Sequence, residues 1–123
     1  MRTALRAKIH RAWVTDANPD NVGSILIDED LMDKIALRSL EKVLVCDVTN
    51  GKRFETSAIA GERGSGVCSV QGAAARVSCK GNCLIIMAFE ETDEPIDPKM
   101  ILVDEENRFV EYLEGAKNVQ QVH

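Results

Sequence analysis

The first part of the chain alternates apolar and polar residues with the period of a β-strand. Leu5, Ala7 and Ile9 lie two residues apart, and the apolar pattern then shifts by one residue to Ala12. Successive side chains of a strand point to opposite faces, so this spacing predicts a strand with a bulge near His10-Arg11. The polar positions between the apolar ones are basic, and they share the other face.

A β-hairpin is predicted farther along, around the dipeptide Asn50-Gly51. Two segments with strand patterns, 42–48 and 53–59, flank this dipeptide. Asn-Gly suits the positive φ angles of a two-residue type I′ turn, which is a common connection between antiparallel strands. The pattern therefore indicates two neighbouring strands joined by a tight turn.

The rest of the pattern predicts more short strands and little helix. Asp28 is a candidate N-cap for a short helix, whose apolar side carries Leu31, Met32, Ile35 and Ala36. A single helical turn is expected at 72–75. Loops rich in turn formers are expected at 16–23, 61–66 and 93–98. Further strands are expected at 24–27, 67–70, 83–90, 100–103 and 109–113. Many short strands in one small domain predict a barrel or a sandwich.

Length and charge narrow the class of protein. The 123 residues fit one domain, which we place at 1–115, followed by a polar, flexible tail at 116–123. The 15 Lys and Arg against 20 Asp and Glu give a net charge of −5, which argues against nucleic acid as the main partner. No apolar run approaches the ~20 residues that cross a bilayer, and the basic N-terminus lacks the apolar segment of a secretory signal. We expect a soluble, cytoplasmic protein with neither a nucleic-acid nor a membrane partner.

The cysteines and histidines do not form a metal-binding pattern. Cys79 and Cys83 have a C-x3-C spacing, but zinc requires a second such pair or nearby histidines. The 2 histidines are His10 and His123. We therefore predict no metal, and reduced cysteines in the core or in turns.

Most familiar catalytic motifs are missing. The sequence has no G-x-S-x-G elbow, no P-loop and no H-E-x-x-H motif. The glycine-rich segment 61–66 superficially resembles a phosphate-binding loop, but it lacks the following Lys-Ser/Thr and leads into a strand. It is interpreted as a plain turn.

The dipeptide Gly23-Ser24 offers a different chemistry. A glycine tolerates strained backbone geometry, which can expose its carbonyl group to the hydroxyl of the next residue. An N-to-O acyl shift and elimination would then cut the chain after Gly23 and convert Ser24 into a pyruvoyl group. That ketone can form a Schiff base with an amine substrate and draw electrons from it, as pyridoxal phosphate does elsewhere. The dipeptide alone is weak support, because Gly64-Ser65 is a second one.

The surroundings of Gly23-Ser24 resemble those of the pyruvoyl-dependent aspartate 1-decarboxylases. The matching segments, in order, are Lys8-Ile-His10-Arg11, Gly23-Ser24 with Ile27-Asp28, Val48-Thr-Asn-Gly-Lys-Arg-Phe54, Glu62-Arg-Gly-Ser65 and Ser69-Val-Gln-Gly-Ala-Ala-Ala75. The resemblance implies a mainly β fold, a six-stranded double-psi β-barrel with short helices. It implies a homotetramer with sites between subunits, self-cleavage at Gly23-Ser24, and conversion of L-aspartate to β-alanine and CO2 for pantothenate synthesis. Neither pyridoxal phosphate nor metal is implied.

The resemblance also assigns roles to individual residues. Ser24 matches the precursor of the pyruvoyl group, which forms the Schiff base. Arg53 and Lys8 match cations that hold substrate carboxylates, although each could be a solvated surface charge. Thr56 matches a hydroxyl that lines the site and assists processing. Gly72, Ala73 and Ala74 match a segment whose backbone contacts substrate. Without the resemblance, these three residues could also form a tight turn.

Four positions depart from the family pattern. Ser57 stands where the family has a tyrosine regarded as the proton donor, so its own role is open. Asn21 replaces an aromatic residue, Gln71 replaces an asparagine, and Cys46 stands where some members have a tryptophan. Three alternatives follow: decarboxylation of aspartate, the same chemistry on a different or bulkier amino acid, and a non-catalytic barrel used for binding or assembly. A need for an accessory protein during processing is also left open.

Overall fold

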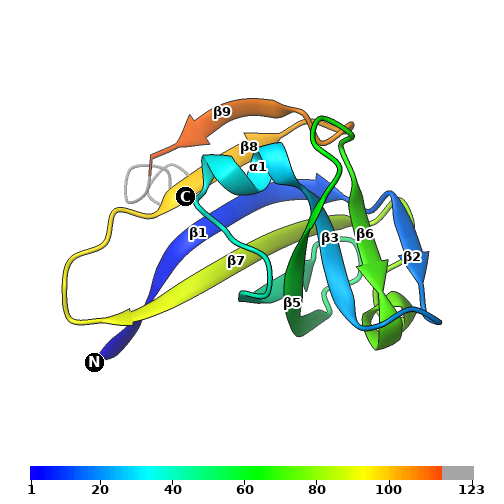
Figure 1. Cartoon of the computed structure of the whole chain (residues 1–123), viewed down its shortest axis with the longest axis horizontal. Helices are drawn as coiled ribbons and strands as arrows, with labels where there is room; N and C mark the ends of the chain where they lie inside the picture. Colours follow the sequence, from blue (N-terminus) through cyan, green and yellow to red (C-terminus); the bar gives the residue numbers. More distant parts are fainter. Residues whose placement is uncertain (115–123) are drawn as a thin grey trace.

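The structure, a computed structural model, describes residues 1–114 (Figure 1). The predicted tail at 116–123 lies outside these residues. The elements, in chain order, are β1 (Arg2–Trp13), β2 (Asp16–Asn18), β3 (Ser24–Asp28), α1 (Glu29–Lys34), β4 (Lys42–Asp47), β5 (Arg53–Gly61), β6 (Cys68–Gln71), the 3₁₀ helix η1 (Gly72–Arg76), β7 (Cys83–Thr92), β8 (Lys99–Val103) and β9 (Phe109–Leu113).

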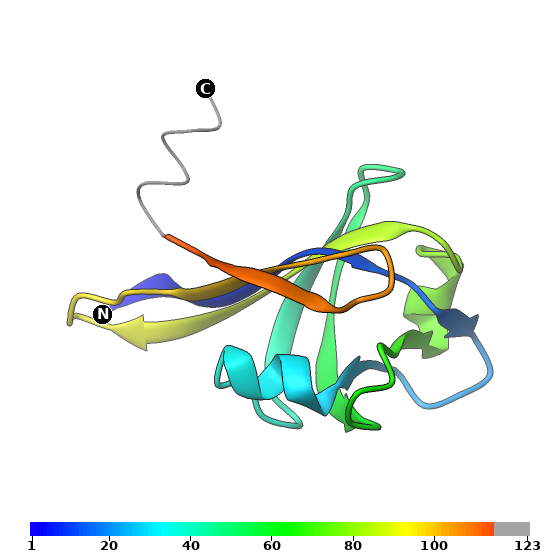
Figure 2. The ribbon, with the colours of Figure 1, turned by 90° about the horizontal axis from the view of Figure 1, so that it is seen from above.

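The strands form a small barrel, as predicted. They join in the order β2-β6-β3-β5-β4-β7-β1-β8-β9. The end of β1 returns to β6, where the Thr15 N–H donates to the Cys68 carbonyl (2.8 Å) and the Thr15 hydroxyl accepts from the Cys68 N–H (2.9 Å). This contact closes a ring of six strands: β1, β3, β4, β5, β6 and β7. β8 pairs with β1, and β9 with β8, outside this ring, and Figure 2 shows the two strands running alongside β1.

Apolar side chains from alternate strand positions fill the barrel. Ile9, Ile25, Val45 and Leu84 belong to this core and have no measurable exposure. Helix α1 adds Leu31 and Met32, and the residue after it, Ile35, is also buried. The side chains that alternate with these core residues lie on the outer face of the sheet, which therefore carries the polar groups that matter for chemistry.

The predicted bulge in β1 is confirmed. The register between β1 and β7 shifts between His10 and Ala12, and Arg11 has a φ of 67°. A second shift, between Leu5 and Ala7, was not predicted. Because of this shift, Ala4 is buried together with Ala7 and Ile9, whereas Leu5 is only half-buried, so the predicted alternation was wrong at Leu5.

Helix α1 begins as predicted but ends early. The Asp28 carboxylate accepts a hydrogen bond from the Asp30 N–H (2.9 Å), which is the expected N-cap. The helix ends before Ala36, which is exposed with a φ of 54°, so its predicted place on the apolar side was wrong. The Asp28 carboxylate also accepts from the Gly64 and Gly66 N–H groups. These contacts hold the 61–66 loop as a turn.

Two other loop predictions need correction. Residues 16–23 are not all loop, because β2 pairs with β6 in parallel. The hairpin between β4 and β5 is confirmed, but its connection is not a two-residue type I′ turn. Only Gly51 of the Asn50-Gly51 pair has a positive φ, 77°. The loop is longer because Asp47 pairs with Lys52 across it, at 2.7 Å from N–H to carbonyl.

The buried Asp47 carboxylate organises this loop. It accepts hydrogen bonds from the Thr49 N–H (2.8 Å) and the Asn50 N–H (3.1 Å), from the Ser78 hydroxyl (2.6 Å) and from the Asn82 amide (2.8 Å). Burial alone raises the pKa of Asp47, but these four hydrogen bonds outweigh it and lower the pKa below its ordinary value of 3.8.

Replacing Asp47 by asparagine should therefore destabilise the fold in a pH-dependent way. We expect a loss of about 2 to 4 kcal/mol at pH 7, because buried donors lose a charged acceptor. Because the pKa of Asp47 is lower in the folded state than in the unfolded state, its carboxylate stabilises the fold when the pH is above the unfolded-state pKa. This contribution is lost as the pH falls through the folded-state pKa. The difference from the wild type should shrink below pH 3.8. Urea unfolding across pH measures it, with Asp97→Asn, a change at an exposed loop residue, as the control. A pH-independent difference would contradict this account.

Candidate active site

Polar side chains form a row across four neighbouring strands of the outer face. Ser24 at the start of β3 pairs with Gln71 of β6. On its other side, the parallel register of β3 and β5, which pairs Ile25 with Ala58, places Ser24 level with Ser57. Ser57 in turn pairs with Lys42 of β4. Because paired residues share a face, the row runs Gln71, Ser24, Ser57, Lys42.

The bond between Gly23 and Ser24 lies against the start of η1. Gly72 has a φ of 78°, and a Cβ atom there would lie 2.6 Å from the Gly23 Cα and 2.9 Å from the Gly23 nitrogen. Gly72 must therefore be glycine, both for its conformation and for this close approach. Thr56, one residue before Ser57, is level with Gly23 by the same register. Ala73, which is exposed, and Ala74, which is half-buried, follow Gly72 in η1.

The Ser24 hydroxyl is confined but weakly bonded. The residue is 9% exposed, and its Oγ atom lies 3.5 Å from the carbonyl oxygen of Val22. That distance is at the upper limit for a hydrogen bond, so this bond to the Ser24 hydroxyl is weak. The predicted acyl shift requires this oxygen to attack the carbonyl carbon of the preceding residue, Gly23.

A network of hydrogen-bonded side chains lies beside Ser24. The sequence analysis did not assign this network to the site. The Asn21 amide donates to Gln71 Oε1, and Gln71 Nε2 donates to the Ser69 hydroxyl. Gln71 and Ser69 are 7% and 5% exposed. One sequence feature indicated this network. The polar residues at 69 and 71 alternate with the apolar Val70, and this alternation places both polar side chains on one face of a strand.

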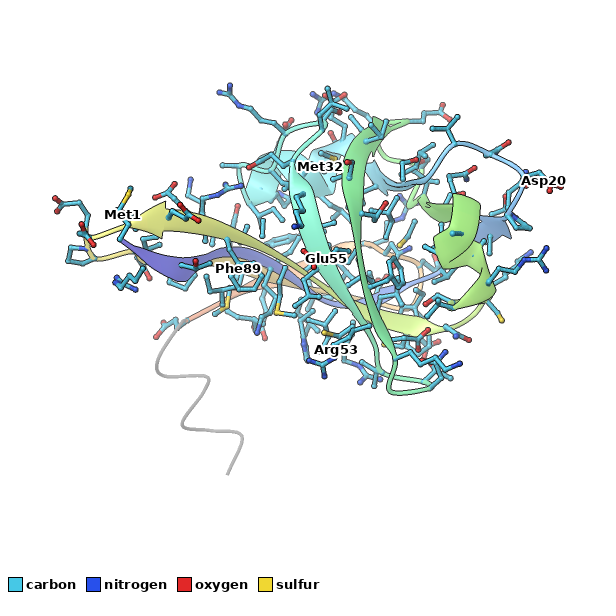
Figure 3. All side chains as sticks on the ribbon, turned by 90° about the horizontal axis from the view of Figure 1, so that it is seen from below. Met1, Asp20, Met32, Arg53, Glu55 and Phe89 are labelled. Atoms are coloured by element: carbon cyan, nitrogen blue, oxygen red, sulfur yellow. The ribbon has the colours of Figure 1, made fainter. Side chains whose placement is uncertain are left out.

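Lys8 and Arg53 do not lie beside Ser24 within one chain. Although the end of β1 reaches β6 at Thr15, Lys8 lies seven residues before that contact, or ~23 Å along the strand. Arg53 lies four residues along β5 from Ser57, or ~13 Å. Figure 3 shows Arg53 well away from Asp20, which belongs to the loop before Gly23. The structure therefore groups Gly23, Ser24, Thr56, Ser57 and Gly72–Ala74, and leaves the two cations apart.

The two cations share the outer face with His10 and Cys46. Arg53 pairs with Cys46, Cys46 with Ile85, and Ile85 with His10, so these side chains form a second row. Lys8 lies two residues before His10. Burial, and then the charges of Lys8 and Arg11, lower the pKa of His10, which keeps its imidazole mostly neutral at pH 7. This second row carries cations on a partly apolar surface, and guanidinium and ammonium groups are chemically suited to binding a carboxylate.

No phenol of the same chain lies beside Ser57. The chain has 1 tyrosine. It is Tyr112 on β9, and its hydroxyl donates to the carbonyl oxygen of Lys34 (3.1 Å). Ser57 is half-buried, and its neighbour across the strands is Lys42. The Lys42 ammonium lies 2.9 Å from the Glu55 carboxylate.

Within residues 1–114, no three His, Cys, Asp or Glu side chains are grouped to hold a metal ion. Cys79 is exposed, Cys83 is buried, and burial raises the pKa of the Cys68 thiol to about 12. In the same part of the chain, no helix combines the length and the apolar character needed to cross a membrane.

Comparison with known proteins gives the class and then the family. A family model described as aspartate decarboxylase matches residues 1–110. The aspartate 1-decarboxylase of Acetivibrio thermocellus is 48% identical over 94% of this chain and 95% of its own length. That of Bacillus thuringiensis is 47% identical over 94% of each chain. These relatives are carboxy-lyases, enzymes that release CO2 from a substrate. The chain belongs to the aspartate decarboxylase family, which is pyruvoyl-dependent in general, and the predicted resemblance is confirmed.

Proposed function

We propose that this chain cuts itself between Gly23 and Ser24, and that the cut protein decarboxylates L-aspartate to β-alanine for pantothenate synthesis. The observation that carries the proposal is the polar row through Ser24, with Gly72 packed against Gly23. Two measurements test it: the intact mass of the purified protein, and CO2 release from aspartate by the cut form. An uncut, inactive protein would favour a non-catalytic barrel.

The cleavage needs no external oxidant or reductant. The Ser24 Oγ bonds to the carbonyl carbon of Gly23, that carbon's bond to the Ser24 nitrogen breaks, and the hydroxyl proton passes to the nitrogen. Loss of a proton from the Ser24 Cα then breaks the Cβ–Oγ bond and releases Gly23 as a carboxylate. Water replaces the nitrogen as ammonia leaves, and residue 24 becomes pyruvoyl. Thr56, level with Gly23, is the hydroxyl that assists the first step.

The residues around position 24 fit a pyruvoyl group. Its small keto group would occupy the space of the Ser24 side chain, between the Gln71 and Ser57 side chains. When present, the group supplies a ketone that takes up the substrate amine and draws electrons as CO2 leaves. The backbone of Gly72, Ala73 and Ala74 borders the same space and would bind the substrate.

Lys8 and Arg53 are proposed to serve the site of a neighbouring copy. This assignment is supported by their distance from Ser24 in the same chain, and by the partly apolar outer face that carries them. The assembly that we propose is a homotetramer with its sites between subunits. An accessory protein for processing is the alternative to spontaneous cleavage, and adding cell extract to uncut protein separates the two.

A second candidate substrate is an amino acid bulkier than aspartate. Small side chains at Ser57 and Cys46, where the resemblance leads one to expect rings, favour it. Both lie on the outer face of the sheet, Ser57 in the row through Ser24 and Cys46 in the row through Arg53. A panel of amino acids assayed for CO2 release with the cut protein distinguishes this candidate from aspartate.

Replacing Arg53 by alanine should reduce kcat/KM for aspartate at least roughly tenfold, the scale of one lost charge-assisted contact. Self-cleavage should change less, because it involves no substrate. Lys52→Ala is the matched control, since Lys52 is an exposed cation next to Arg53. Steady-state kinetics on fully cut protein measure the effect. Unchanged aspartate turnover in Arg53→Ala would remove the carboxylate-binding role.

A further inference from the structure

The loop that leads into the cleavage site is exposed and loosely attached. Asn21, Val22 and Gly23 are all exposed, and Val22 is 90% exposed. Its backbone is bonded to Asn18, the last residue of β2: the Asp20 N–H donates to the Asn18 side chain, and the Asn21 N–H donates to the Asn18 carbonyl. Among the hydrogen bonds of the described residues, the one from the Asn21 amide to Gln71 ties this loop to β6, beside Ser24.

Gln71 is a rigid anchor for that bond. It is buried, ends β6 and pairs with Ser24 in the β3–β6 ladder. Its Nε2 donates to the buried Ser69 hydroxyl, which turns Oε1 toward the Asn21 amide. The link therefore runs in one direction, from the Asn21 donor through Gln71 to Ser69. A side chain without a donor at position 21 cannot make it.

Residues 21–23 also pack closely against the backbone of Gly72. A Cβ atom at Gly72 would lie 3.1 Å from the Asn21 carbonyl oxygen and 2.6 Å from the Gly23 Cα. Residues 21–23 are thus packed against the backbone of Gly72 and tied by Asn21 to Gln71, the residue before it. Together these contacts fix where the Gly23 carbonyl lies relative to the Ser24 hydroxyl. An intramolecular attack depends steeply on that placement.

We propose that Asn21 is a positioning residue for cleavage between Gly23 and Ser24, and that it acts through Gln71. The inference rests on the proposed function, because it presupposes self-cleavage. Asn21 and Gln71 are two of the positions at which the sequence departs from the family pattern. The structure shows that they contact each other, so the two departures act as a pair.

A double-mutant cycle on the full chain tests the proposal. Wild type, Asn21→Leu, Gln71→Leu and the double variant are purified uncut, and the cut fraction is followed by intact mass over time. Leucine keeps the approximate volume of each side chain and removes its hydrogen bonding. Val22→Ala is the matched control in the same loop. Thermal unfolding of the uncut forms shows whether an effect is merely structural.

Asn21→Leu should slow cleavage by roughly threefold to tenfold, the scale of one neutral hydrogen bond, while its Tm stays close to that of the wild type. The double variant should be no slower than Gln71→Leu alone, because one interaction is lost in both. Cleavage of Asn21→Leu at the wild-type rate would overturn the proposal, as would multiplicative effects of the two substitutions. A wild type that never cleaves would instead overturn the proposed function.

Discussion

Replacing Ser24 by alanine should leave the chain uncut indefinitely, whereas the wild type should yield fragments 1–23 and 24–123. Alanine lacks the oxygen that attacks the Gly23 carbonyl, so the effect is complete rather than partial. Intact mass after prolonged warming measures it, and the larger wild-type fragment should carry a pyruvoyl group in place of an N-terminal amine. No later step of the proposed reaction is open to the uncut variant.

The second Gly-Ser dipeptide provides the control for this experiment. Ser65→Ala should cleave like the wild type. The Ser65 hydroxyl donates to the Glu62 carbonyl (2.6 Å), and the exposed loop around it is held by Asp28. If only intact wild-type chain is found, and no added activator restores cleavage, then the pyruvoyl assignment is wrong.

Introducing tyrosine at position 57 should raise aspartate turnover, by roughly 10²- to 10⁴-fold if a general acid is restored in full. The carbon that loses CO2 must take up a proton. A serine hydroxyl lies close to its own backbone and is a weaker acid than a phenol, which extends across the site from the same position. We expect the wild type to turn over aspartate slowly but measurably, because the cations and the ketone remain.

Ser57→Phe is the matched control, because it adds the ring without the hydroxyl. If the phenol acts as the acid, then Ser57→Tyr alone accelerates the reaction, measured as kcat per cut chain. Equal rates for the two variants would assign the gain to the filling of space. A cut Ser57→Tyr protein that is no faster on aspartate, beside a wild type that is faster on a bulkier amino acid, would establish the second substrate.

The local features of the fold could be predicted from the sequence, since short-range patterns determine them. The bulge at His10-Arg11 follows from a shift in alternation, and the Asp28 cap follows from its place before an apolar run. The connection at Asn50-Gly51 was predicted wrongly because the Asp47 carboxylate makes a longer loop more stable. Its partners Ser78 and Asn82 are distant in sequence, and no local pattern reveals them.

The surroundings of Gly23-Ser24 could be predicted only in part, for a physical reason. The sequence points to Gly23-Ser24 because the proposed reaction needs those two residues next to each other in the chain. Ser24 pairs with Gln71 and lies level with Ser57 because of the register of three strands, and that register cannot be predicted from the sequence pattern. Asn21 and Gln71 were noticed as departures, but their contact became visible only in the fold.

The central place of β1 has a consequence for the life of the cut protein. This strand lies between β7 and β8, and its Ile9 is fully buried in the core. The fragment 1–23 that the proposed cleavage would produce contains all of β1, so this interior strand would no longer be joined through the chain to β3. Folding of the original chain is a unimolecular process. After such a cut, recovery from denaturation would require two polypeptides to meet, so its rate would depend on concentration. A cut protein would therefore preserve a fold that was reached before its own chain was broken.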